Sequence, residues 1–113
     1  MKLPTIKKRK DFVLSNKFGY KIFNKNFILQ KYNQNEQKEP SLKFGFTATK
    51  RIGNAVHRNR AKRRMRALIS LFLKENRLLF DHTSSYVLVA KKSLVKASFF
   101  DLKTEMKECL NKS

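Results

Sequence analysis

The sequence predicts an α+β fold, a two-layer α-β sandwich in which helices cover a small central sheet. Three patterns indicate it. Residues 42–49 alternate apolar and polar side chains, as a half-buried strand does. Residues 86–90 are apolar on both faces, which is typical of a central strand. Between them, a helix from an N-cap at Asn54 to about Glu75 gathers one apolar stripe: Ala61, Met65, Leu68, Ile69 and Phe72.

Shorter segments complete the expected order α-β-β-β-α-β-α. A first helix over residues 8–16 ends before Gly19, a short strand near 21–23 precedes a strand over 27–32, and Ser98 opens a last helix with a capping box. At 113 residues the chain is long enough for one core and is expected to be a single domain. Residues 1–6 are expected to form a flexible arm, and the polar stretch 33–41 a hairpin loop.

Charge indicates the class of partner. Twenty-seven lysines and arginines oppose eight acids, which gives a net charge of +19, and the apolar and aromatic content is that of a folded domain. One cysteine excludes an internal disulfide, and no cluster has the spacing of metal ligands. The acids are scattered along the chain, so a carboxylate metal site and catalysis by the chain itself are not expected.

One segment concentrates the positive charge. Residues 50–66 hold eight lysines or arginines and no acid, whereas a merely solvated helix mixes both signs. Arginine suits phosphate oxygens, so the segment predicts a nucleic-acid-binding surface. Asn59 could be an idle surface residue or could contact a base or ribose edge. Gly45 and the small hydroxyls around it would let an extended ligand lie close to the strand.

The run Phe44-Gly45-Phe46-Thr47-Ala48-Thr49-Lys50-Arg51-Ile52-Gly53-Asn54-Ala55-Val56-His57-Arg58-Asn59-Arg60-Ala61-Lys62-Arg63-Arg64 resembles the signature of the bacterial ribonuclease P protein subunit. The resemblance implies a left-handed βαβ crossover over residues 42–90, a topology shared with a ribosomal protein domain. It also implies a 1:1 complex with one large catalytic RNA that cuts the 5′ leader from precursor tRNA. The RNA would hold the Mg²⁺ ions and perform the hydrolysis.

The same resemblance implies two RNA-binding surfaces. A cleft for the single-stranded leader would use Phe12, Phe27, Gln30 and Thr47; Asn16 and Gln30 replace aromatics that are common in the family. The catalytic RNA would meet the basic segment through Lys50, Arg51, Asn54, Arg58, Asn59, Arg60, Lys62, Arg63 and Arg66.

Other interpretations stay open from the residues alone. The charge also fits a small ribosomal or ribosome-assembly protein without a role in cleavage. A basic amphipathic helix on an anionic membrane is disfavoured, because its apolar stripe is needed for the core and has no Trp. The pattern alone does not decide whether Phe12, Phe18, Phe27 and Tyr32 stack on bases or fill the core. We expect a cytoplasmic protein without a membrane segment or small-molecule ligand.

Overall fold

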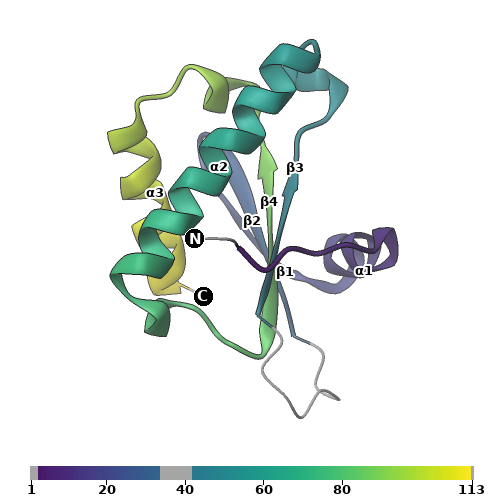
Figure 1. Cartoon of the computed structure of the whole chain (residues 1–113), viewed down its shortest axis with the longest axis vertical. Coiled ribbons are helices and arrows are strands. Elements are labelled where there is room, and N and C mark those ends of the chain that lie inside the picture. The colour runs from purple at the N-terminus through teal and green to yellow at the C-terminus, as the bar shows by residue number, and fades with distance from the viewer. Residues whose placement is uncertain (1–2, 34–41, 113) are drawn as a thin grey trace.

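The computed structural model describes residues 3–33 and 42–112 and has the expected order of helices and strands (Figure 1). The helices are α1 (Arg9–Phe18), α2 (Ala55–Glu75) and α3 (Phe99–Lys112). The strands are β1 (Tyr20–Phe23), β2 (Phe27–Asn33), β3 (Lys43–Thr47) and β4 (Ser84–Ala90). Short 3-10 turns connect them: η1 (Lys50–Ile52), η2 (Arg77–Leu79) and η3 (Lys92–Val95).

The strands form one mixed sheet in the order β1-β2-β4-β3. β4 pairs antiparallel with β2 and parallel with β3, so β3, α2 and β4 form a βαβ unit; its left-handed sense stays a prediction. The prediction that residues 33–41 form a hairpin loop is wrong. A hairpin joins two neighbouring strands, whereas β2 and β3 lie on opposite sides of β4. β4 takes the central place because its side chains are apolar on both faces. Residues 34–41 themselves lie outside the described residues.

The main core lies between the sheet and the two longer helices. α2 and α3 cover one face of the sheet and α1 lies on the other (Figure 1). Three rings anchor this core: Phe44 stacks on Tyr86 at 5.9 Å between centroids, and Phe80 meets both edge-on. The Tyr86 hydroxyl accepts a hydrogen bond from the Asp81 amide at 2.8 Å, so the buried ring has its polar atom satisfied.

Residues 3–6 lie along the outer edge of β3. The Ile6 amide donates to the Phe44 carbonyl at 2.8 Å, and the Phe44 amide donates to the Pro4 carbonyl at 2.9 Å. The Ile6 side chain is buried. The prediction of a flexible arm over 1–6 is therefore wrong for residues 3–6; residues 1 and 2 lie outside the described part. The physical reason is that an edge strand exposes backbone donors and acceptors, and this segment pairs with them.

The helix ends follow the expected capping. Asn54 Oδ1 accepts a hydrogen bond from the His57 amide at 3.0 Å, and Ser98 Oγ accepts one from the Asp101 amide at 3.1 Å. The expected apolar stripe of α2 is buried from Ala61 to Phe72. No helix within residues 3–33 and 42–112 is long and apolar enough to cross a bilayer.

Candidate nucleic-acid interface

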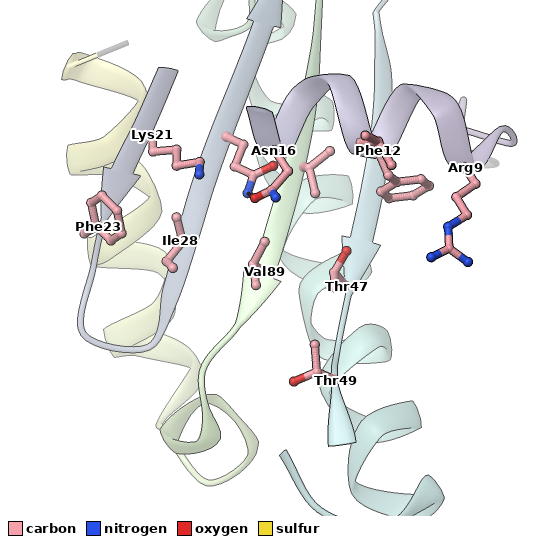
Figure 2. Close-up of a pocket in the computed structure, with 12 residues that line it drawn as sticks. Arg9, Phe12, Asn16, Lys21, Phe23, Ile28, Thr47, Thr49 and Val89 are labelled. Atoms are coloured by element: carbon pink, nitrogen blue, oxygen red, sulfur yellow. Dashed lines mark hydrogen bonds between the residues drawn. The ribbon is translucent and has the colours of Figure 1, made fainter. Parts of the chain in front are cut away.

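A cleft lies on the face of the sheet that α2 and α3 do not cover. α1 crosses this face (Figure 2). The hollow has a volume of about 420 Å³. Its lining comes from α1 and from all of the strands: Arg9, Phe12, Val13, Asn16, Lys21, Phe23, Ile28, Gln30, Thr47, Thr49, Val87 and Val89.

Strand register builds the floor of the cleft. One row across the sheet runs from Ile28 through Val89 to Thr47. Residues paired in register share one face of the sheet. The strand neighbours Phe27 and Leu88 face the main core, so this row points away from it. Two apolar residues and one hydroxyl give a floor on which an unpaired base can lie flat, with a hydrogen-bonding group at its β3 end.

Phe12 forms the α1 wall of the cleft and packs onto Gly45. A Cβ atom at position 45 would lie 2.5 Å from Phe12 Cε1 and 2.8 Å from Phe12 Cζ. Gly45 is therefore needed to let the ring approach the strand. The expected use of Gly45, close approach of an extended ligand, is wrong, because the Phe12 ring occupies that space.

Gln30 lines the cleft but is engaged by α1. It is 4% exposed, and its Oε1 accepts a hydrogen bond from Ser15 Oγ at 3.2 Å. Its Nε2 donates to Asn16 Oδ1 at 3.3 Å. The amide thus attaches α1 to the sheet and satisfies the fully buried Ser15 hydroxyl. A contact between Gln30 and the leader stays a prediction.

Phe27 is not a cleft residue, and that prediction is wrong. It is 0% exposed and belongs to the main core, while its neighbour Ile28 faces the cleft. Alternation along β2 places Phe27 and Gln30 on opposite faces, so strict use of the period would have excluded it. The same alternation would have predicted that Ile28 lines the cleft.

Phe12 and Thr47 line the cleft, and their contact with the leader stays a prediction; Phe18 and Tyr32 are not among the lining residues. Lys21 and Phe23 were missed because β1 is only four residues long and shows little periodicity of its own.

The basic segment forms η1 and the first half of α2. Arg58, Lys62 and Arg66 follow one another at four-residue intervals and so share a stripe. The Arg66 guanidinium lies 5.8 Å from the centre of the Phe46 ring on β3, which places this stripe beside the edge strand. Arg58 and Lys62 are half-buried, and the other predicted contacts are exposed: Lys50, Arg51, Asn54, Asn59, Arg60, Arg63 and Arg66. Their contact with RNA stays a prediction.

Arg64 has a structural position within the same segment. Its Nη1 donates to the carbonyls of Leu94 at 2.7 Å and Val95 at 2.9 Å, and its Nη2 donates to the carbonyl of Ala97. Burial lowers the pKa of Arg64, and the positive charge of Arg60 adds to this. The guanidinium therefore satisfies the carbonyls at the end of η3 and holds η3 against α2.

A second hollow of about 650 Å³ lies where α2 begins, between η1 and η3. Gly53 forms the turn here with a φ of 138°, and His57 Nδ1 lies 2.8 Å from Asn54 Oδ1. Lys92 and Lys96 line the far side and extend the positive surface beyond the predicted segment. They were missed because they lie more than 25 residues away along the chain and only the fold brings them to the start of α2.

Carboxylates, histidines and the cysteine do not gather at either hollow. Within residues 3–33 and 42–112, no three such side chains lie close enough together to hold a metal ion. The two hollows can offer cations, hydroxyls and apolar surface to a ligand, which suits a polyanion carrying flat bases.

Known proteins resemble this chain along nearly its whole length. The family model described as Ribonuclease P matches residues 2–113, which is nearly the whole chain. The chain belongs to the ribonuclease P protein family. Two family members, each called "Ribonuclease P protein component", come from Bacillus pumilus and Erythrobacter litoralis. The first is 32% identical over 96% of this chain and 86% of its own length, and the second is 33% identical over 96% and 84%.

Solved ribonuclease P proteins have the same fold. The Staphylococcus aureus RNase P protein superposes with a TM-score of 0.76 at 23% identity, covering 97% of this chain and 94% of its own. The Thermotoga maritima RNase P protein gives a TM-score of 0.76 at 19% identity, covering 96% of each chain. The α+β architecture predicted from the sequence is thereby confirmed.

Proposed function

We propose that this chain, as the protein component of ribonuclease P, binds one catalytic RNA in a 1:1 complex and helps it to remove the 5′ leader of precursor tRNA. One observation carries the proposal: one face of the sheet carries a cleft with an apolar floor, and α2, which covers the other face, carries a stripe of cations along the edge strand β3. The two surfaces differ in chemistry, so they suit two different RNA elements, an unpaired strand and a structured backbone.

The hydrolysis is assigned to the RNA. Cleavage requires water to attack a phosphodiester while the leaving oxygen is stabilised, and metal ions commonly do both. The acids of the described residues are not grouped to hold such ions, which supports Mg²⁺ being held by the RNA and the substrate. In this scheme the chain contributes binding and positioning. Cytoplasmic placement is part of the proposal, since tRNA precursors would be met there.

The cations of α2 would neutralise phosphates of the catalytic RNA. Each neutralised phosphate releases counterions, which gives affinity without sequence specificity. The cleft would hold the leader next to that RNA, and so raise the affinity for precursor tRNA over mature tRNA. Such a difference matters because the enzyme must release its product, which lacks the leader.

Reconstitution tests the proposal. The protein, a ribonuclease P RNA and Mg²⁺ together should cut precursor tRNA once, at the mature 5′ end, and bind it more tightly than mature tRNA. Protein without RNA should leave the substrate intact. Comparable cleavage by the protein alone would contradict the assignment of chemistry to the RNA. Recovery of ribosomal RNA in place of ribonuclease P RNA with the protein purified from cells would favour the ribosomal alternative.

A further inference from the structure

An exposed aromatic side chain lies at the β1 end of the cleft. Phe23 is the last residue of β1 and is 68% exposed. It pairs in register with Ile28, and its neighbour Ile22 is buried in the main core. Alternation therefore directs Phe23 to the cleft face, where it is one of the lining residues. Figure 2 shows Phe23 at the opposite end of the cleft from Phe12.

The Phe23 ring is free to receive a flat partner. Among the described residues, the ring pairs and the cations placed over rings do not include Phe23. Of the side chains that line the cleft, Phe12 and Phe23 are the aromatic ones. Phe12 uses part of its ring against Gly45, so Phe23 offers the more accessible ring surface of the two.

Positive charge accompanies this ring. Lys21 is two residues earlier on the same face and pairs in register with Gln30. Arg9 lies at the other end of the cleft, beyond Phe12 (Figure 2). An apolar floor with an aromatic ring near each end and a cation beside each ring is the arrangement by which proteins hold single-stranded nucleic acid. An apolar protein segment in the cleft would offer no negative charge to these two cations.

We propose that Phe23 is a stacking site for a base of the single-stranded 5′ leader, with Lys21 pairing with a neighbouring phosphate. This rests on the proposed function, because it assumes that the leader enters the cleft. Phe23 and Thr47 are three strand spacings apart, about 14 Å. Phe23 and Phe12 therefore hold different nucleotides of one leader, and Phe23 holds the one nearer β1.

The test uses the reconstituted holoenzyme and precursor tRNAs whose leaders are shortened one nucleotide at a time. Phe23→Leu keeps an apolar side chain but removes the aromatic face, and should weaken binding of long-leader substrate about fivefold or more. Phe23→Trp should bind at least as tightly as the original. The loss in Phe23→Leu should vanish once the leader is too short to reach β1, and mature tRNA should bind equally to all variants.

Phe100→Leu is the matched control, because Phe100 on α3 is 74% exposed and does not line the cleft. Unchanged long-leader affinity in Phe23→Leu, while the unaltered holoenzyme still prefers precursor over mature tRNA, would overturn the stacking site and leave the proposed function standing. Equal losses for precursor and mature tRNA would also overturn it. An unaltered holoenzyme with no preference for leader-bearing tRNA would instead remove the proposed function, and this inference with it.

Discussion

The ring of Phe12 lies directly over the backbone of Gly45, where even a methyl group on the strand would meet it. One residue belongs to α1 and the other to β3, so their contact sets how closely the helix approaches the sheet. Phe12 is only half-buried, which leaves part of its ring facing the cleft. Placement of α1 and the shape of the cleft therefore depend on the same contact.

Gly45→Ala should displace Phe12 and destabilise the protein by about 1–3 kcal/mol, the usual cost of overpacking. The check is urea unfolding of the single variants and of the double variant Gly45→Ala with Phe12→Ala. The double variant should be less destabilised than the sum of the two, because without the ring the nearest atom to the new methyl group outside the adjacent residues is Ile6 Cδ1 at 3.1 Å, the end of a flexible side chain. Strictly additive losses would show that the two residues do not compete for space.

Phe12→Ala should weaken holoenzyme binding of precursor tRNA by about tenfold, because one stacked base contributes roughly 1–3 kcal/mol. Mature tRNA should bind almost as before. The measurement is the ratio of the two dissociation constants, which cancels a general loss of folded protein. A loss that is equal for both ligands would make Phe12 a purely structural residue.

Replacing Arg58, Asn59 and Arg60 together by alanine should weaken binding of the catalytic RNA and reduce its salt dependence. Each lost phosphate contact should lower the slope of log affinity against log salt by about 0.7–0.9. None of the three lies on the buried stripe of α2, so circular dichroism should be unchanged. An unaltered salt slope in a folded variant would show that the catalytic RNA binds a surface other than this helix.

Arg64→Ala should act on folding, in contrast to its neighbour Arg63→Ala. Loss of the guanidinium leaves the carbonyls of Leu94 and Val95 without their charged donor, a cost of about 1–3 kcal/mol. Arg63 is exposed, so its removal should leave the unfolding free energy nearly unchanged and weaken RNA binding. Urea unfolding and RNA titration of both variants separate the two roles. Equal stability of the two variants would contradict the structural role of Arg64.

The lowered pKa of Asp81 predicts that the folded protein loses stability in acid. Hydrogen bonds from the Thr83 hydroxyl and then the Thr83 amide lower the pKa of Asp81 from 3.8 to about 2, with Ser84 and Lys31 adding to this. Because the folded pKa is the lower one, the stabilisation is present above pH 3.8 and is lost as the pH falls toward 2.

Discounted for solvent screening, the loss should be about 1 kcal/mol in the unfolding free energy, and Asp81→Asn should abolish it. Asp101→Asn on α3 removes the same charge and is the matched control. The comparison is made by urea unfolding between pH 5 and pH 2. If the unfolding free energy of Asp81→Asn falls between pH 5 and pH 2 as steeply as that of the unaltered protein, another group causes the acid sensitivity.

Local pattern was enough for most elements of the fold. The boundaries of α2 follow from the Asn54 cap and the apolar stripe, both of which are properties of neighbouring residues. The start of α3 after its Ser98 cap is likewise local. The central place of β4 was implied by its apolar run. The pairing of residues 3–6 with β3 was not, because an edge strand accepts a partner through its backbone, whose hydrogen bonds carry no side-chain pattern.

Some features of the candidate site likewise follow from the sequence, and others follow only from the fold. The sequence by itself determined that a dense positive segment precedes and enters a helix, since charge and order are written in the residues. Only the tertiary structure decided which arginine is structural: Arg63 and Arg64 are chemically identical, and the carbonyls of η3 that engage Arg64 lie about 30 residues away. It also decided that Phe23 joins the cleft. A cleft is formed by side chains from separate strands, and strand order and register arise from packing of the whole chain.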